Sequence, residues 1–293
     1  MAKFSKTSFT QRGSRLAFAA LKAQIAALER IDTRTADMDA LAMRLRRLFN
    51  GYACLTRMLD VPYAYRARKH ETPAPFEHVS QLWYPRAEHI KHLGRVNRIG
   101  QPMFYISASH DTATLEMRPE VGELITILSL LPVDPSRRLH VMEIGMAEKE
   151  SLHARPRNVQ LLEETPYGPS FLKRNHGIKQ NLTIRSFLAT EFIRVVARGN
   201  EHEFKKTIVI GEFLSSSNRI DGLQYPSLAG DISQWKGGAN LALKPETADK
   251  FFKPSECWMI RVEAREPEPG AAFAVRCIGK AKKIDEDGRI HWS

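Results

Sequence analysis

The spacing of apolar residues changes along this chain, and the change limits the folds that it can adopt. At 14–31 and at 35–50, apolar residues recur every three or four positions, as on one face of an α-helix. Further on, compact apolar runs typical of strands are mixed with one more helix-like segment, without the regular alternation of a parallel βαβ protein. The pattern therefore predicts an α+β fold that opens with a pair of helices.

The expected strands follow the helical pair and extend to the C-terminal part of the chain. They are 103–107, 124–131, 139–144, 207–213, 222–225 and 241–243, with a final antiparallel pair at 258–264 and 272–278. One further helix is expected at 182–196. The stretch at 148–179 is polar and contains several prolines and glycines, so it is predicted to be a long loop that lies over a site.

A piece rich in proline, histidine and glutamate, at 70–78, marks the expected domain boundary. Residues 1–75 are predicted to form a helical N-terminal appendage. Residues 76–293 are predicted to form the main domain, with a core at 82–250 and a C-terminal strand pair at 255–293. We favour a packing appendage, or an arm that joins copies into a homo-oligomer, over a DNA-binding helix pair.

Composition narrows the class of protein. With 293 residues, 43% hydrophobic and 26% charged, the chain matches a soluble globular protein. No uncharged apolar run approaches the ~18 residues that cross a bilayer, so no membrane role is expected. Cys54, Cys257 and Cys277 form no CxxC and no Cys/His cluster, which indicates a reducing cytoplasm with buried thiols and no metal site.

The net charge of +11 calls for an anionic partner or a solvated basic surface. A phosphate-bearing ligand, an anionic membrane surface and nucleic acid all fit this charge. The basic residues are spread along the chain and are not interleaved with aromatic residues in a recognised nucleic-acid motif. Nucleic acid is therefore the minor alternative.

The segment 93–118 carries the side chains best suited to chemistry. It holds Arg95 in a basic loop, Tyr105 in a strand and Glu116 at a helix start, and Ser227 follows a later strand at a turn. A guanidinium can bind two phosphate oxygens, a tyrosine ring can stack on a flat base, and a carboxylate can stabilise positive charge. Each residue alone also has an ordinary explanation: a surface arginine, a core tyrosine, a surface glutamate and a turn serine.

Together these segments resemble the RES-domain family, which is named after its Arg, Glu and Ser. The resemblance covers about 82–250 and rests on 94–97 (GRVN), Gly100, 103–109 (MFYISAS), Ala113 with Glu116, 220–227 (IDGLQYPS) and 238–243 (GANLAL). It implies a split antiparallel sheet of the ADP-ribosyltransferase type that clasps NAD and needs no metal. Val96 departs from the pattern, because the family usually has an aromatic residue there.

The resemblance also assigns roles to individual residues. It gives Arg95 the family's Arg position, Tyr105 the aromatic position on the strand, Glu116 the Glu position, Ser227 the Ser position, and Arg86 a looser match to an upstream arginine near the pyrophosphate. Two arginines suit the negative pyrophosphate of NAD, and the Tyr105 ring suits nicotinamide. Glu116 suits the positive charge that develops on the ribose, and Ser227 can orient the nicotinamide amide or the ribose.

The resemblance implies an enzyme that breaks the nicotinamide–ribose bond of NAD. The ADP-ribose can pass to water or phosphate, as in a glycohydrolase or phosphorylase, or to a protein, as in an ADP-ribosyltransferase. The resemblance further implies a toxin that an Xre-type antitoxin silences. The alternative from another class is a catalytically idle RES fold that binds nucleic acid or protein.

Overall fold

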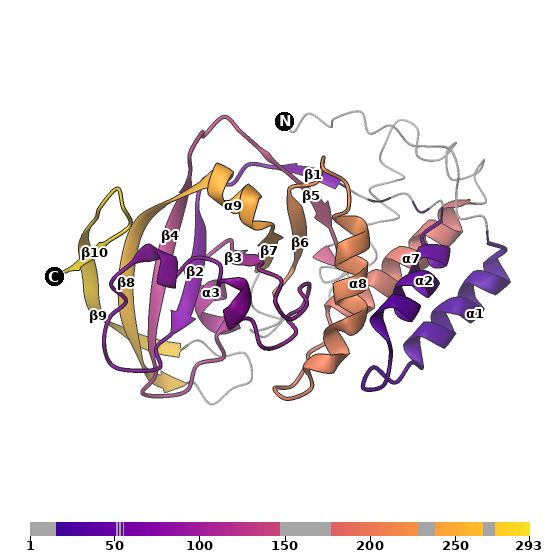
Figure 1. The fold of residues 1–293 in the computed structure, drawn as a ribbon, viewed down its shortest axis with the longest axis horizontal. Helices are drawn as coiled ribbons and strands as arrows, with labels where there is room; N and C mark the ends of the chain where they lie inside the picture. Colours follow the sequence, from indigo (N-terminus) through magenta and orange to yellow (C-terminus); the bar gives the residue numbers. More distant parts are fainter. Residues whose placement is uncertain are drawn as a thin grey trace.

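The computed structural model describes residues 16–50, 52, 54, 56–146, 177–227, 238–265 and 273–293. Within these ranges the strands form one large sheet, and the helices pack against it (Figure 1). The loop expected at 148–179 lies outside the described residues, except for its end, where a helix begins at Gly177.

The described part of the chain begins with two helices, continues with strands interspersed with helices, and ends with three strands. The elements are α1 (Phe18–Glu29), α2 (Met38–Leu48), β1 (Thr56–Leu59), β2 (Ala64–Lys69), η1 (Val79–Gln81), η2 (Ala87–His89), β3 (Phe104–Ser107), α3 (His110–Glu116), β4 (Leu124–Pro132), β5 (Leu139–Glu143), α7 (Gly177–Phe192), η3 (Glu201–Phe204), α8 (Lys205–Leu214), β6 (Gly222–Pro226), β7 (Ala239–Leu243), α9 (Pro245–Phe251), β8 (Phe252–Arg265), β9 (Phe273–Ile284) and β10 (Ile290–Trp292).

The strands form a 10-stranded sheet in the order β1-β5-β6-β7-β3-β2-β4-β8-β9-β10. The neighbouring strands β5 and β6 run parallel, and the other neighbours run antiparallel. The centre of the sheet is its weakest connection, because β2 and β3 are joined by the single pair Tyr65 and Ser107. This mixed, mostly antiparallel arrangement agrees with the expected α+β class.

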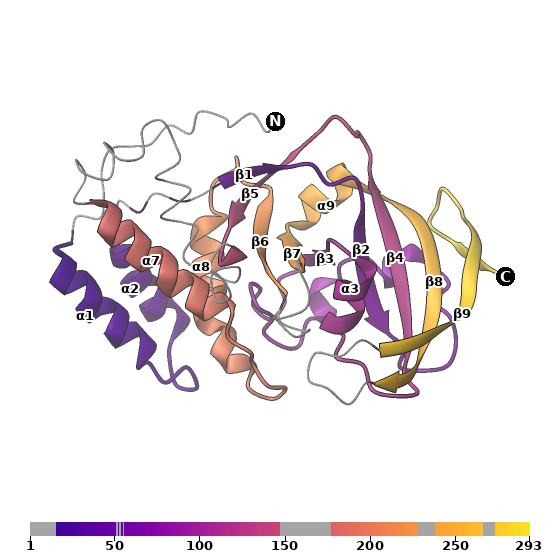
Figure 2. The ribbon, with the colours of Figure 1, turned by 180° about the vertical axis from the view of Figure 1, so that it is seen from behind.

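The helices α1, α2, α7 and α8 gather at one end of the sheet, as the two opposite views show (Figure 1, Figure 2). The α1 and α2 leucines, among them Leu21, Leu28, Leu41 and Leu45, belong to one buried cluster with residues of α7, α8 and the sheet. The predicted helical pair is confirmed, and Asp37 caps α2 by accepting hydrogen bonds from two backbone N–H groups. Since one core runs through both parts, the helical pair packs as a continuation of the main domain.

The expected strand at 207–213 is wrong, because this segment is the helix α8. Its sequence is rich in β-branched residues, which favour strands. Buried residues occupy almost its whole length, from Lys206 to Gly211 and again at Leu214. A helix that is buried on all sides lacks a polar face, so its periodicity does not distinguish it from a buried strand.

The sheet also begins earlier than expected. Residues 1–75 were assigned to the helical appendage, but the structure places β1 and β2, which fall in this range, inside the sheet. In β2 the buried Ala64 and Ala67 flank the half-buried Tyr65 and Arg66, so the sequence lacks the apolar–polar alternation of a typical strand. The arginine and the nearby prolines hid the strand in the sequence.

The other expected strands are confirmed with small changes at their ends, and so is the helix that begins at Gly177. The final pair is longer than expected, and β10 extends it along the far end of the sheet (Figure 1). Of the thiols expected to be buried, Cys257 is buried, Cys54 is half-buried and Cys277 is exposed. Burial raises the pKa of Cys54 to about 11 and that of Cys257 to about 12.

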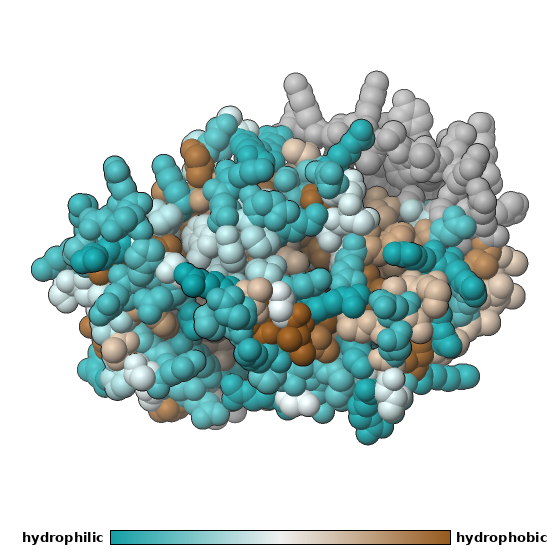
Figure 3. Space-filling view, in the orientation of Figure 1, coloured by the Kyte–Doolittle hydropathy of each residue, from teal (hydrophilic) through white to brown (hydrophobic). Residues whose placement is uncertain are grey.

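The surface that Figure 3 shows is mainly hydrophilic, with small and separate hydrophobic areas. The exposed large apolar residues come from distant elements, for example Met43 on α2, Ile99 before β3 and Val275 on β9. Among the described helices, none combines the length and the hydropathy of a membrane span.

Candidate functional site

Glu116 is the last residue of the short helix α3. The hydroxyl of Ser109 caps the start of this helix, accepting a hydrogen bond from the backbone N–H of Thr112 at 3.1 Å. Ala113 packs α3 on the sheet in a buried cluster that includes Ala67 of β2. The cap and this packing fix the helix, so the carboxylate at its end has a defined position.

The Glu116 carboxylate meets two donors that come from β7 and from the end of β6. The Ser227 hydroxyl donates to Glu116 Oε1 at 2.6 Å, and the Asn240 side-chain amide donates to the same oxygen at 2.6 Å. The strands position both donors, because Ser227 N–H donates to Gly238 C=O at 2.9 Å where β6 and β7 pair. The structure thus brings together Glu116 and Ser227, which lie 111 positions apart in the chain.

Tyr105 places its ring beside this site and uses its hydroxyl to fix a loop. The hydroxyl donates to Asn97 Oδ1 at 2.7 Å and accepts from the Val96 N–H at 3.1 Å. A Cβ atom at Gly94 would lie 2.1 Å from Asn97 Oδ1, so the loop requires glycine there. Burial raises the pKa of Tyr105 well above its ordinary value, and the hydroxyl therefore stays protonated.

Val96, the position that departs from the family pattern, packs against α8. It is 3% exposed, and a Cβ atom at Gly211 would lie 3.2 Å from its side chain. The small pair of Val96 and Gly211 lets α8 lie close to the loop that carries Arg95. A larger aromatic residue at position 96 would collide with α8 in this arrangement.

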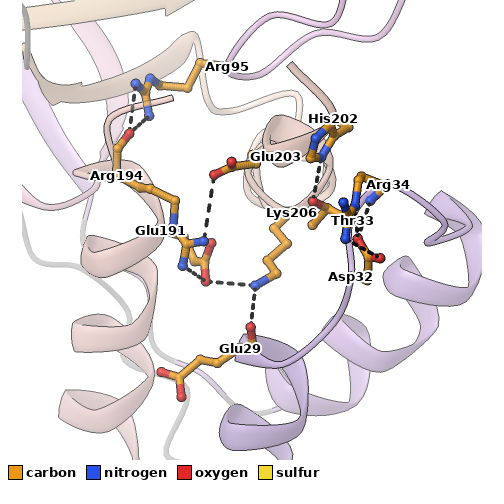
Figure 4. Close-up of polar contacts among 10 residues, drawn as sticks. All are labelled: Glu29, Asp32, Thr33, Arg34, Arg95, Glu191, Arg194, His202, Glu203 and Lys206. Atoms are coloured by element: carbon orange, nitrogen blue, oxygen red, sulfur yellow. Dashed lines mark hydrogen bonds and ion pairs between the residues drawn. The ribbon is translucent and has the colours of Figure 1, made fainter. Parts of the chain in front are cut away.

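Arg95 caps the C-terminal end of α7 (Figure 4). Its guanidinium donates to Phe192 C=O at 2.9 Å and to Arg194 C=O at 3.4 Å. These carbonyls lie where helix carbonyls lack intrahelical partners, and a cation there also stabilises the helix dipole. The same guanidinium lies 5.9 Å from the Tyr225 ring and 5.2 Å from the Phe204 ring. Arg95 is therefore at the site, but backbone carbonyls engage it, and its phosphate role stays a prediction.

Arg86 lies apart from the other four candidate residues. It precedes η2 and is exposed. In the part of the chain that the structure describes, no hydrogen bond or ion pair joins its side chain to Arg95, Tyr105, Glu116 or Ser227. Its pyrophosphate role stays a prediction.

The structure adds three residues that were not among the candidates. Asn240 belongs to the segment 238–243 that carried the resemblance, but its amide gave no separate signal. Tyr225 is buried. Burial raises its pKa far above the ordinary value, Tyr105 and Glu116 raise the pKa further, and Arg95 lowers it. Because these groups act on one phenol, they share one electrostatic neighbourhood.

The third addition is Arg66 of β2. Its guanidinium donates to the backbone C=O of Tyr105 at 2.7 Å and lies 5.4 Å from the Phe104 ring. Burial, and to a smaller extent Arg68, lowers the pKa of Arg66 to about 10, so it stays charged at neutral pH. Its buried Nε atom has no hydrogen-bond partner among the described residues. A desolvated cation with an unused donor is a candidate anion-binding group.

Among the described residues, no group of three or more His, Cys, Asp or Glu side chains is placed to hold a metal ion.

The family of this protein was sought by comparing its sequence and structure with those of known proteins. A search of curated proteins and a search of solved structures each gave no match. The family model of the RES domain matches residues 62–262, which is more than half of the chain. The match begins just before β2 and ends within β8, so it contains β3, α3, β6, β7 and all the candidate site residues. This chain belongs to the RES-domain family.

Proposed function

We propose that this protein consumes NAD by breaking its nicotinamide–ribose bond, with Glu116 as the central carboxylate and Ser227 as its partner. RES domains are generally associated with enzymes that act on NAD. One observation carries the proposal. Glu116 and Ser227, assigned from the family pattern, are joined by a hydrogen bond of 2.6 Å, and the buried Tyr225 lies within the electrostatic influence of Glu116 and Tyr105.

Cleavage of the nicotinamide–ribose bond is favoured by a negatively charged group beside the ribose. When the bond breaks, its electron pair goes to the nicotinamide ring, which leaves as a neutral base, and C1′ of the ribose gains positive charge. The carboxylate of Glu116 stabilises that charge and accepts a hydrogen bond from a ribose hydroxyl. An acceptor oxygen then forms the new bond to C1′. If the acceptor is water or a protein hydroxyl, its proton passes to solvent, whereas a phosphate dianion attacks through an oxygen that carries no proton. Ser227 orients the carboxylate and stays close to the reacting groups.

The pyrophosphate of NAD needs cations, and this chain offers several. We propose Arg66 as the guanidinium that meets a phosphate, because its buried Nε atom lacks a partner among the described residues. Arg95 and Arg86 stay in the proposal as further cations for the same group. The ADP-ribosyltransferase type of sheet also belongs to the proposal, supported by the single residue pair that joins β2 to β3.

The direct test is to incubate the purified protein with NAD and measure free nicotinamide. We expect release by the wild type and a loss of ~100-fold to ~1000-fold in Glu116→Gln, because one electrostatic contact to the transition state is removed. Glu120→Gln, a change at an exposed glutamate beyond α3, is the matched control and should keep full activity. Equal release by Glu116→Gln and the wild type would exclude Glu116 from the mechanism.

The same assay separates the possible acceptors. Free ADP-ribose as the product indicates water, and ADP-ribose 1-phosphate in phosphate buffer indicates phosphorolysis. Label from NAD that appears on a protein indicates ADP-ribosyl transfer. No release with any acceptor, together with a DNA mobility shift that weakens in salt, would favour the idle binding module.

We also propose that the enzyme acts as a toxin with an Xre-type antitoxin as its partner, which family membership supports. Expression of the wild type in bacteria should lower cellular NAD and stop growth, whereas expression of Glu116→Gln should not. Normal growth with undiminished NAD during wild-type expression would contradict the toxin role while leaving the chemistry open to the assay in vitro.

A further inference from the structure

A chain of buried hydrogen bonds continues behind the Glu116 carboxylate into the sheet. Asn240 donates to Glu116 Oε1 at 2.6 Å, and its own side-chain oxygen accepts from the Ser107 hydroxyl at 2.7 Å. Ser107 and Asn240 are each 5% exposed and form a registered pair between β3 and β7. Strand pairing therefore sets the distance between Ser107 and Asn240, and water does not intervene.

The Asn240 amide lies between the Glu116 carboxylate, which only accepts hydrogen bonds, and the Ser107 hydroxyl, which holds the other end of the amide. A side-chain amide has a donor end and an acceptor end, and the two are nearly isosteric. Because Ser107 donates to the amide oxygen, the NH₂ end faces Glu116. If the amide turned over, its oxygen would face the carboxylate and repel it, and the hydrogen bond to Glu116 would be lost. Ser107 thus acts on Glu116 without touching it.

The two donors on one oxygen also distinguish the two oxygens of Glu116. Ser227 and Asn240 both donate to Oε1. Among the described residues, no hydrogen bond or ion pair to Oε2 occurs. A carboxylate fixed through one oxygen presents the other in a defined direction, which pre-organises it for a ligand.

We propose that Ser107 and Asn240 are positioning residues, which hold Glu116 by Oε1 and direct Oε2 to the ribose of the substrate. This inference rests on the proposed function, since the ribose is the group that Oε2 would meet. It assigns a role to two buried polar residues that a fold alone does not require, because apolar residues of similar size would fill the same strand positions.

The experiment uses the full chain and the nicotinamide assay on Ser107→Ala. We expect kcat to fall at least tenfold with KM changed less than twofold, because the carboxylate loses orientation while the binding groups stay intact. Ser107→Thr keeps the hydroxyl and should restore most of kcat. Ser129→Ala, which changes another buried serine of the same sheet, is the matched control and should leave kcat unchanged. An unchanged kcat in folded Ser107→Ala would overturn the inference.

A second readout does not depend on activity, so it separates failure of this inference from failure of the proposed function. The shifts in the urea midpoint caused by Ser107→Ala and by Glu116→Gln should be less than additive in the double variant, since both act on one hydrogen-bond chain. Additive shifts would overturn the inference even if the wild type cleaves NAD. If the wild type releases no nicotinamide, the proposed function fails, and a non-additive result would still support the hydrogen-bond chain.

Discussion

Two buried polar networks in this molecule are built differently. The site network consists of Ser107, Asn240, Ser227 and Glu116, and its donors to the carboxylate are neutral. The junction network lies where α1, α7 and α8 meet, and it is centred on Lys206, which donates to Glu191 Oε1 at 3.3 Å (Figure 4). Among the described residues, the site network binds Glu116 through Oε1 alone, whereas the junction network neutralises the Glu191 carboxylate with the Lys206 ammonium.

The junction network is closed on several sides. The side chains of Lys206 and Glu191 are each 2% exposed, Lys206 Nζ also donates to Glu29 C=O at 3.4 Å, and Arg194 donates to Glu191 at 3.4 Å. Such a pair fixes the contact between the helical end and the rest of the chain. We infer that the junction network contributes mainly to folding stability, and the site network mainly to catalysis.

Arg95 is the residue that connects the two regions. Its guanidinium bonds Phe192 C=O and Arg194 C=O near the junction network, and it lies over the Tyr225 ring beside the site network. The end of α7 therefore belongs to both regions. Substitutions in each network can therefore test whether one affects mainly stability and the other mainly activity.

The largest expected effect is on stability, in Lys206→Met. Among the described residues, removing the ammonium leaves Glu191 buried with only the longer contact to Arg194, and breaking a buried pair in this way costs about 3–5 kcal/mol. Urea unfolding of the purified protein measures the change. NAD cleavage by the folded fraction should change little, because no atom of the site network is altered.

The double variant Lys206→Met/Glu191→Leu is the matched control for that experiment. It replaces the pair with apolar residues of similar volume, so no uncompensated charge remains, and most of the lost stability should return. If the double variant is as unstable as Lys206→Met, the loss comes from packing rather than from the unpaired charge.

The next effect is on ligand binding, in Arg66→Met. A desolvated guanidinium with a lowered pKa costs free energy to bury, so its removal should change the unfolding free energy by only ~1 kcal/mol. KM for NAD should rise at least tenfold if Arg66 meets a phosphate. Arg68→Met is the control, because Arg68 is exposed and contacts the backbone of Gln81 and the Phe76 ring. Equal KM values for the two variants would remove Arg66 from the phosphate site.

Arg95→Lys should affect both regions at once. A lysine cannot reproduce the two-pronged contact with Phe192 C=O and Arg194 C=O, so we expect a loss of about 1–2 kcal/mol in unfolding free energy. If Arg95 also meets the pyrophosphate, NAD affinity, measured by calorimetry on the inactive Glu116→Gln background, should fall as well. A loss of stability with unchanged affinity would limit Arg95 to capping α7.

The sequence singled out two residues, Glu116 and Ser227, that the structure brings into contact, and their roles in catalysis stay predictions. Glu116 and Ser227 were identified because short motifs preserve their neighbours, and the structure places their side chains in contact. Asn240 lay in one of those motifs, but its amide meets Glu116 and Ser107 only once the separate strands and α3 come together. Arg66 gave no signal, because its burial depends on the Phe104 ring and on the short pairing of β2 with β3.

The errors in the fold have two physical causes. The segment 207–213 was taken for a strand because burial on all sides removes the polar face that periodicity needs. The strand β2, which is only partly buried, was missed because Arg66 and the nearby prolines interrupt a strand-like pattern. In α8 the closeness of Gly211 to Val96 and Leu223 shows that the helix fits its tertiary surroundings. Tertiary contacts therefore decided the structure where local preference was ambiguous.

The smallest expected effect is in Tyr105→Phe, and it asks whether the loop at 94–97 belongs to the site network. Loss of the hydroxyl leaves Asn97 Oδ1 and the Val96 N–H without this partner, which costs ~1–2 kcal/mol of unfolding free energy. The ring remains, so stacking on nicotinamide should persist, and KM for NAD should change less than threefold. Tyr105→Leu removes the ring as well and should raise KM further. A large fall in kcat for Tyr105→Phe would give the hydroxyl a part in the chemistry, whereas a loss of stability alone would assign it to the architecture that holds Arg95 beside Tyr225.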